Sequence, residues 1–444
     1  MPLEIRPRNW LILLALLCVL TYLPALTQPF IADDYDNIPQ ARTYGPVSGW
    51  PALAAHPVHS YRPLFLILTY WVDRAFGPHP AAFYAVSIVL HILVTWLVFA
   101  LGAWNLVGWR VSGPAAAFFA VYEGHQEAVM WYSAAYEPLM LIFGLGAFIL
   151  WIRWLQSPHP RHFWYVFALI CFVLTLFSKE SGVAFAALMA LPLLDAKVPR
   201  RRALVGILPF AVLSAVFAVS ILAGRTYHPR LDDGSFSLNS PFFVTFLSSF
   251  VRLFWLCGLL SLAALAAWRA WSRKRLVPVA LAWAAISLVP YSFLTYMTRV
   301  PSRQTYLASV GLSLVIGAAW IEVRERFARR RWVPVLVVAV VLIHNIGYLW
   351  TRKRTQYLER AEPTEALIAL ARRANGPIYV HRFPYPEVVA RGAVVLGAGK
   401  PAESVIWAPW QGSSHNLTDY VFSLDGTVPV IPERTSADRT RATR

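Results

Sequence analysis

The sequence predicts an all-α polytopic membrane protein that carries a small soluble α/β appendage at its C-terminal end. Hydrophobic residues make up 57% of the 444 positions and charged residues only 14%, whereas a soluble chain carries about a quarter charged residues. Apolar runs recur, and each run of about 20 residues is long enough to cross a hydrocarbon core roughly 30 Å thick. After residue 351 the composition changes, and shorter helix and strand patterns replace the apolar runs.

Eleven apolar segments are candidate transmembrane helices, and the third, fifth and sixth are the shortest. They cover residues 10–30, 80–104, 112–122, 135–152, 163–177, 181–194, 203–223, 243–268, 276–297, 304–321 and 332–350. The first run follows two arginines, as a signal peptide would, but it lacks a small-residue cleavage site. We therefore expect a retained helix. The cysteines lie inside apolar runs without metal-type spacing, so they predict neither a disulfide framework nor a zinc site.

The distribution of positive charge predicts the orientation of the chain in the membrane. A net charge of +17 would suit a nucleic-acid partner, but Lys and Arg sit in short links between apolar runs. Most of them fall in the links on one side, which places the N-terminus in the cytoplasm and residues 31–79 outside. We expect residues 355–444 to lie outside as well, and the basic residues 352–354 are the one detail that argues mildly against it. Residues 61–76 are amphipathic and aromatic, so we expect an interfacial helix in the first outer loop.

A domain boundary is expected just after the last apolar run. Residues 1–351 form the predicted membrane domain, 352–432 a small soluble α/β domain and 433–444 a disordered tail. Residues 362–373 predict a soluble helix. The segments "GPIYVHR" and "GAVVLGAG" predict short strands.

An acidic cluster directly follows the first predicted span. Asp33, Asp34 and Asp36 fall within four positions of a chain that contains few acids. Carboxylates at the mouth of a membrane helix suit a general base or a divalent metal. They equally suit a solvated helix end, so the cluster alone leaves both interpretations open.

Further polar groups recur in the other links predicted to face outward. They are Arg62 in "YRPL", Glu123, His125 and Glu127 in "EGHQEAVMWY", Lys179 and Glu180 in "SKES", and Arg299, Arg303 and Tyr306 in "RVPSRQTYLASVG". Arg252 lies well inside its predicted span, which is unusual for a charge unless it has a partner or reaches the headgroups. Because Arg and Lys bind phosphate, acids and cations on one face suit a phosphate-linked substrate on a lipid.

These groups also have structural interpretations that the sequence leaves open. Lys179 and Glu180 fit a turn between two spans, and His125 fits a hydrogen-bonded packing residue. Arg299 and Arg303 fit interfacial anchors.

In their order and spacing, these motifs resemble those of the GT-C superfamily of polytopic glycosyltransferases. The acidic pair, "YRPL", "H-x-E-A-V-x-W", "SKES" and "SRQTYLASVG" are similar to motifs of protein O-mannosyltransferase-like enzymes, including the transmembrane tetratricopeptide O-mannosyltransferases, over residues 10–320. The chain departs from "HPxH" at Tyr122-Glu123-Gly124-His125, and Ala308 stands where the family has Pro. No tetratricopeptide array follows the membrane domain, which favours a bacterial-type enzyme.

The resemblance implies a GT-C-like module of about eleven transmembrane helices and a sugar transfer, with inversion, from a polyprenyl-phosphate donor to an acceptor hydroxyl on the outer face. It implies Asp33 or Asp34 as the catalytic base. The donor phosphate would be bound by Arg62, Lys179, Arg252 and Arg303. Residues that would bind substrate or support the site are His125, Glu127, Glu180, Arg299 and Tyr306. No cofactor is required, and a divalent metal held by Asp34 and Glu127 stays an open alternative.

The partners that the resemblance implies are a polyprenyl-phosphate-linked sugar, a protein, lipid or glycan acceptor, and membrane lipid. The expected location is the inner (cytoplasmic) membrane of a bacterium, with the active site on the periplasmic or outer face. A non-catalytic carrier or flippase for a phosphate-bearing lipid would use the same groups for binding alone, but the repeats and broken mid-membrane helices of transporters are not evident. A membrane scaffold that presents the C-terminal domain would leave the outward polar groups unexplained.

Overall fold

A computed structural model describes residues 7–46, 62–224, 234, 236–268, 275–295, 299–407 and 417–427. By its contacts the chain divides into two compact units. The membrane unit comprises Met1–Gln28 and Gln40–Thr355, and the C-terminal unit comprises Pro29–Pro39 and Gln356–Arg444. The predicted disordered tail, residues 433–444, lies outside the described residues, as does the middle of the first outer loop, residues 47–61.

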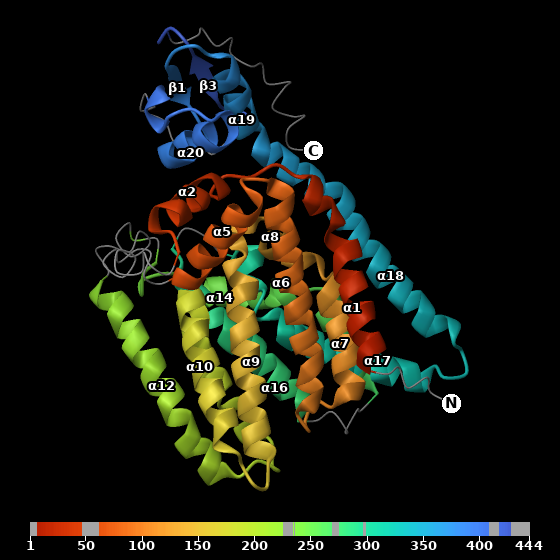
Figure 1. Ribbon diagram of the computed structural model, residues 1–444. Coiled ribbons are helices and arrows are strands. Elements are labelled where there is room, and N and C mark those ends of the chain that lie inside the picture. Colours follow the sequence, from red (N-terminus) through yellow and green to blue (C-terminus); the bar gives the residue numbers. More distant parts are fainter. Residues whose placement is uncertain are drawn as a thin grey trace. The chain divides into compact units, whose positions relative to one another are not determined.

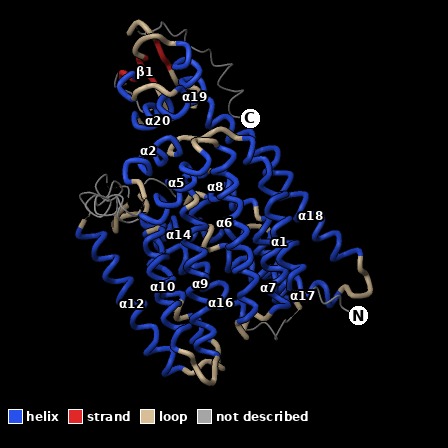
Figure 2. Tube along the Cα trace, in the orientation of Figure 1, coloured by secondary structure: helices blue, strands red, loops and turns tan. Residues whose placement is uncertain are grey.

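The membrane unit is a bundle of helices, traced in Figures 1 and 2. Its helices are Pro7–Tyr22 (α1), Pro63–Phe76 (α5), Pro80–Ala100 (α6), Trp109–Val121 (α7), Gln126–Met130 (α8), Tyr136–Gln156 (α9), His162–Ser178 (α10), Ala184–Leu188 (α11), Arg200–Ala223 (α12), Phe242–Phe254 (α14), Cys257–Ala267 (α15), Leu276–Leu288 (α16), Ser309–Arg326 (α17) and Trp332–Tyr348 (α18). Helix α2, Asp34–Tyr44, runs from one unit into the other.

Six helices in the described part of the chain are long and apolar enough to cross a membrane. They are Pro7–Thr27, Pro80–Ala103, Tyr132–Gln156, Arg200–Ala223, Leu276–Phe293 and Trp332–Arg373. The pair α14 and α15 would make a seventh span, bent by 74°. The expected number of about eleven spans is therefore not confirmed, because segments such as 163–177 and 181–194 fold as the shorter apolar helices His162–Ser178 and Glu180–Leu194.

Small residues let the central helices of the bundle approach closely. A Cβ atom at Gly311 of α17 would lie 2.2 Å from the Ala280 carbonyl oxygen of α16. At Gly317 it would lie 2.6 Å from the Val111 carbonyl oxygen of α7. Close backbone approach at small residues is the usual means of helix packing in membranes, where lipid supplies no hydrophobic driving force between helices. The side chains buried around this core are large, and they include Trp104, Trp151 and Trp283.

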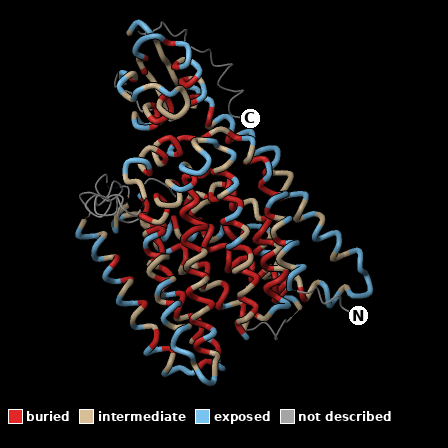
Figure 3. Tube along the Cα trace, viewed as in Figure 1, coloured by how far each residue is buried: buried red, intermediate tan, exposed pale blue. Residues whose placement is uncertain are grey.

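The outer helices of the bundle present apolar side chains outward. Figure 3 shows exposed residues along α12 and α18. Among them are Val205 and Val216 of α12 and Ile343 of α18, each more than three-fifths exposed. A helix that satisfies its own backbone hydrogen bonds and exposes apolar side chains suits contact with lipid. The chain is an integral membrane protein.

The C-terminal unit contains a small α/β fold. Its elements are Arg354–Arg373 (α19), Ile378–Arg382 (β1), Glu387–Ala398 (α20), Val405–Trp407 (β2) and Val421–Ser423 (β3). The sheet has the order β2-β1-β3, with β2 parallel and β3 antiparallel to β1. A core of apolar side chains from the helices and strands includes Leu367, Ile378, Val380, Val394 and Val405.

Two of the three elements predicted for this region are confirmed. Residues 362–373 belong to α19, and "GPIYVHR" contains β1. The predicted strand in "GAVVLGAG" is wrong, because these residues end helix α20. A short apolar run does not distinguish a strand from a buried helix. Pro386 before the first turn and the left-handed Gly399 after the last one mark the helix ends.

Candidate functional site

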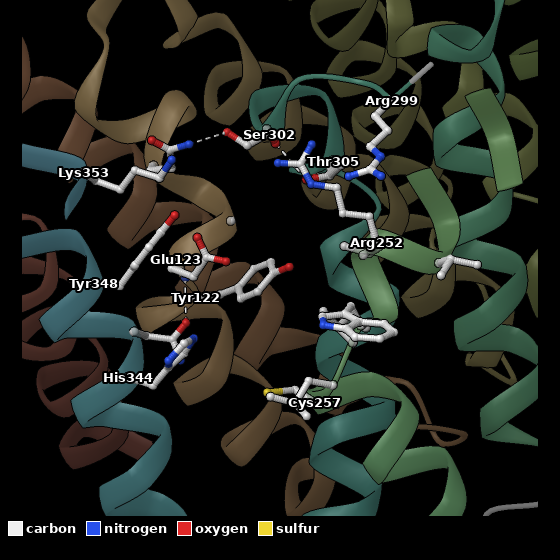
Figure 4. A pocket seen from close by; sticks show the side chains of 18 of the residues that line it. Tyr122, Glu123, Arg252, Cys257, Arg299, Ser302, Thr305, His344, Tyr348 and Lys353 are labelled. Atoms are coloured by element: carbon white, nitrogen blue, oxygen red, sulfur yellow. Dashed lines mark hydrogen bonds between the residues drawn. The ribbon is translucent and has the colours of Figure 1, made fainter. Parts of the chain in front are cut away.

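A cavity of about 740 Å³ lies in the membrane unit. Its polar lining includes Glu123, Arg252, Arg299, His344 and Lys353 (Figure 4). Apolar and aromatic side chains complete the wall, among them Tyr122, Val251, Trp255, Leu256, Leu312 and Tyr348. A cavity of this size with converging polar groups is typical of a small-molecule site.

One wall of the cavity is formed where the chain breaks between α14 and α15. Arg252 stands in the last turn of α14, and α15 begins at Cys257 after a bend of 74°. Leu256, between the two helices, has a φ of 57°. A leucine at positive φ is strained, and strained residues are concentrated at ligand sites and switches. The break therefore turns residues from the end of one helix and the start of the next toward a common space.

The opposite wall comes from the end of α18. Residues Leu349–Lys353 continue α18 as one turn of π-helix, a feature frequent at functional sites. His344 and Tyr348 lie one helical turn apart, and the Lys353 Nζ atom lies 5.4 Å from the centre of the Tyr348 ring. Figure 4 shows these three side chains across the cavity from Arg252 and Arg299.

Glu123 lies between the two walls in the short helical turn Glu123–His125 that follows α7. Its backbone N–H donates to the Asn345 Oδ1 atom at 2.8 Å, so α18 fixes the position of this turn. Burial raises the pKa of the Glu123 carboxyl, although the charges of Lys353, His344 and Arg252 oppose the shift.

The charges of the lining suit an anion. Arg252, Arg299 and Lys353 contribute three positive charges and Glu123 one negative charge, so the formal sum with neutral His344 is 3 − 1 = +2. Arg252 donates to the Val300 carbonyl at 3.3 Å. Within the described ranges, neither Arg252 nor Arg299 forms an ion pair with a carboxylate. Phosphate oxygens would match the guanidinium donors of these side chains.

Three of the four cations predicted to bind phosphate are instead paired with acids. Arg62 donates twice to Glu180, at 2.8 and 2.9 Å, and Arg303 lies 3.4 Å from Glu127. Lys179 pairs with Glu137 and also donates to the Tyr291 hydroxyl at 3.0 Å. Of the predicted four, Arg252 lines this cavity. Phosphate binding by Arg62, Lys179 and Arg303 stays a prediction. A buried charge needs a partner, and here the protein supplies one for the other three.

The residues predicted to support the site have separate positions. Arg299 lines the cavity, while Glu180 and Glu127 serve as the acid partners of Arg62 and Arg303. His125 and Tyr306 are fully buried, with their ring centres 4.6 Å apart. The His125 Nε2 atom is 2.7 Å from the Ser309 hydroxyl, and the Tyr306 hydroxyl is 2.7 Å from the His91 Nδ1 atom. Both side chains therefore stabilise the packing beside α17.

The acidic cluster belongs to the C-terminal unit and its two candidate bases differ in exposure. Asp34 is completely buried, and its Oδ2 atom accepts the Ile31 N–H at 3.0 Å where α2 begins. Asp33 is exposed. Ala32, immediately before it, has a φ of 46°, which is uncommon for a residue with a Cβ atom. The carboxylate of Asp34 thus stabilises the turn, and that of Asp33 faces outward from it.

The described residues do not fit the divalent metal that the sequence left open. No group of three or more His, Cys, Asp or Glu side chains in those ranges could hold a metal ion. Asp34 accepts a backbone N–H, and Glu127 accepts from Arg303.

The sequence motifs do not mark Lys353, His344 or Glu137 as site residues. Lys353 belongs to the basic run after the last apolar span, and His344 lies inside that span. A carboxylate in an apolar run is usually functional or paired with a cation. Glu137, near the start of the apolar helix α9, could have been singled out on that ground.

Comparisons with known proteins show the fold of the chain. A scan against protein-family models and a search of curated proteins find no match. Among solved structures, the oligosaccharyltransferase AglB from Archaeoglobus fulgidus, in complex with an inhibitory peptide and a dolichol-phosphate, matches with a TM-score of 0.55 and 14% identity over 84% of this chain. The match spans 58% of AglB, less than two thirds of its length.

An oligosaccharyltransferase from Archaeoglobus fulgidus, tethered to an acceptor peptide, matches with a TM-score of 0.51 and 13% identity over 94% of this chain and 61% of that one. ArnT from Cupriavidus metallidurans, bound to undecaprenyl phosphate, has a TM-score of 0.47 and 15% identity over 87% of this chain and 74% of that one. The chain has the fold of the GT-C superfamily, as its motifs predicted.

Proposed function

We propose that this integral membrane protein with a GT-C fold is a glycosyltransferase that moves a sugar from a polyprenyl-phosphate donor to an acceptor hydroxyl. The observation that carries the proposal is the cationic cavity at the α14–α15 break. AglB, which has the same fold, was solved with a dolichol-phosphate, a lipid phosphate of the same chemical class.

The cavity is proposed to bind the phosphate of the donor through Arg252, Arg299 and Lys353. A polyprenyl-phosphate sugar is a phosphodiester with a single negative charge, whereas the released lipid phosphate carries about −1.5 to −2 at neutral pH. The formal charge of +2 in the cavity matches the released phosphate better than the donor. The site therefore favours the charge that develops on the leaving group, which is the kind of interaction that accelerates a reaction.

Asp33 is the proposed base. Its carboxylate would take the proton of the acceptor hydroxyl while the hydroxyl oxygen forms a bond to the anomeric carbon. The bond from that carbon to the phosphate oxygen breaks, and its electron pair leaves with the lipid phosphate, so the configuration inverts. Asp34 is proposed to hold the turn that presents Asp33. Asp33 and Asp34 both belong to the C-terminal unit.

The charge distribution of the links supports a reaction on the outer face of the membrane. We further propose that this membrane is the inner membrane of a bacterium. The acceptor would be a protein, lipid or glycan.

The two neighbouring aspartates allow a matched test of this function. Membranes containing the parent, Asp33→Asn or Asp34→Asn are incubated with a panel of radiolabelled polyprenyl-phosphate sugars, and label is followed into protein, lipid and glycan fractions. We expect Asp33→Asn to lose on the order of a hundredfold in transfer rate and to keep donor binding. Asp34→Asn keeps an oxygen that can accept the Ile31 N–H, so its loss should be smaller.

Parent-rate transfer by both variants would contradict the role of the acidic pair. Donor binding by the parent without transfer of any sugar in the panel would instead favour a non-catalytic carrier or flippase for a phosphate-bearing lipid.

A further inference from the structure

The acidic loop, defined as residues 29–39, lies within the C-terminal unit. In the sequence it follows α1 of the membrane unit and the short 3-10 helix Leu23–Thr27. By its contacts, however, it belongs with residues Gln356–Arg444, more than 300 positions further along the chain. A domain without an assigned role therefore surrounds the turn that carries Asp33.

Helix α20 contacts the backbone of this loop directly. A Cβ atom at Gly392 would lie 1.9 Å from the Tyr35 carbonyl oxygen and 2.8 Å from its carbonyl carbon. Atoms of real side chains essentially never come so close, so only glycine permits this approach without a shift of the backbone. Ala390 and Ala393 of the same helix are also small and fully buried.

Helix α19 contacts the other end of the same residue. The Tyr35 hydroxyl donates to the Glu365 Oε1 atom at 3.2 Å, and only 3% of Tyr35 is exposed. The Tyr35 ring also packs edge-on against Phe30, at 5.8 Å between ring centres. Two helices of the C-terminal domain thus hold Tyr35, one at its carbonyl and one at its hydroxyl.

The turn between these contacts is strained and short. Ala32 has a φ of 46°, and the amides of Asp34 and Tyr35 donate to the Ile31 and Ala32 carbonyls at 3.1 and 3.0 Å. A strained turn persists only where its surroundings determine it. We infer that the C-terminal domain holds the acidic loop in the conformation that presents Asp33, with Gly392 and Glu365 as positioning residues. This inference rests on the proposed role of Asp33 as the base.

Substitutions in the full chain can loosen these contacts one at a time. Gly392→Ala forces α20 and the loop apart. Gly376→Ala is its matched control in the same domain, since a Cβ atom there would meet nothing within 4 Å. Glu365→Ala removes the acceptor for the Tyr35 hydroxyl, whereas Glu365→Gln keeps an oxygen at that position.

The experiment measures three quantities for each purified variant. Hydrogen exchange of amides 34–37 reports on the loop, donor KM and binding of polyprenyl phosphate report on the donor site, and kcat reports on transfer. For Gly392→Ala we expect faster exchange of these amides and a kcat lower by on the order of a hundredfold, the scale known for a misplacement of about 1 Å. Donor binding should stay at the parent value. Glu365→Ala should show the same pattern more weakly, and Glu365→Gln and Gly376→Ala should match the parent.

The outcomes separate this inference from the proposed function. Unchanged exchange in both Gly392→Ala and Glu365→Ala overturns the inference. So does faster exchange with an unchanged kcat when Asp33→Asn abolishes transfer. If the parent transfers no sugar, the proposed function fails, and the role of the domain in positioning Asp33 fails with it, whatever the exchange shows.

Discussion

Replacing Arg252 by Ala should weaken the binding of polyprenyl phosphate about ten- to a hundredfold. A hydrogen bond to a charged group contributes about 1.5–3 kcal/mol. Two unit charges 4 Å apart at an effective dielectric constant of 20 interact by about 4 kcal/mol. Because Arg252 is exposed at the cavity, solvent screening reduces the Coulomb contribution, and a loss of about 1.4–2.8 kcal/mol remains. That loss corresponds to the stated range in Kd.

The measurement is a titration of the purified full chain, in bilayers without anionic lipid, with radiolabelled polyprenyl phosphate. Thermal unfolding shows whether each variant is folded. Arg252→Lys should recover part of the affinity, because it restores the charge but not the planar fork. Arg110→Ala is the matched control, since Arg110 pairs with Glu325 at an exposed position where 72% and 52% of the two side chains are accessible.

Arg303→Ala provides the discriminating comparison. Because Arg303 is already paired with Glu127, its loss should weaken binding less than the loss of Arg252. Parent affinity in folded Arg252→Ala would refute the reasoning. A larger effect of Arg303→Ala would also refute it, by showing that the acid-paired cations bind the phosphate.

Three further predictions concern the charges and the thiol of the membrane unit. Because burial raises the pKa of Glu123, its carboxyl takes up a proton as the pH falls toward that raised value, and the cavity charge rises from +2 toward +3. Binding of the singly charged donor to the parent should therefore tighten at low pH. A Glu123→Gln variant that kept the full pH response would refute this. Lys179→Met leaves the fully buried Glu137 without its ion-pair partner and should lower the free energy of unfolding, measured with denaturant, by about 3–5 kcal/mol. The double variant Lys179→Met/Glu137→Gln should regain most of this stability, and equal losses in the single and double variants would contradict the pairing. Cys257 lines the cavity and Cys171 does not, so bound polyprenyl phosphate should slow maleimide labelling of Cys257 alone. Mass spectrometry of peptides measures the labelling, and equal rates with and without the lipid would count against the site.

Most of what depends on contiguous residues was predictable from the sequence. Apolar length identified the long spans. The charges of the links predict an orientation in the membrane, which stays a prediction. The order of the motifs indicated the GT-C fold, although none of them is specific alone. The expected number of about eleven spans is not confirmed, because an apolar run too short to cross a bilayer resembles a span in composition but not in length.

The candidate site was less predictable, because its residues meet only in the folded chain. In the sequence, Arg252 stands out as a charge inside a predicted span and Arg299 as one of the outward polar groups. Lys353 comes from the turn after α18, and no motif marks it. The cavity also depends on the break at Leu256. No Gly or Pro stands between Phe242 and Cys257 to indicate a break there.

The sequence by itself therefore determined that this protein spans a membrane and has a GT-C fold, and it predicted acids and cations suited to a lipid phosphate. Only the tertiary structure decided which of those charges are already balanced. Arg62 and Glu180 are 118 positions apart, and Lys179 and Glu137 are 42 apart, so no local pattern reveals either pair. The structure also decided that Asp34 is buried and Asp33 is exposed, because burial of a carboxylate depends on the residues packed around it. An ion pair or a buried carboxylate is a property of distances in space, and the order of residues along the chain does not contain those distances.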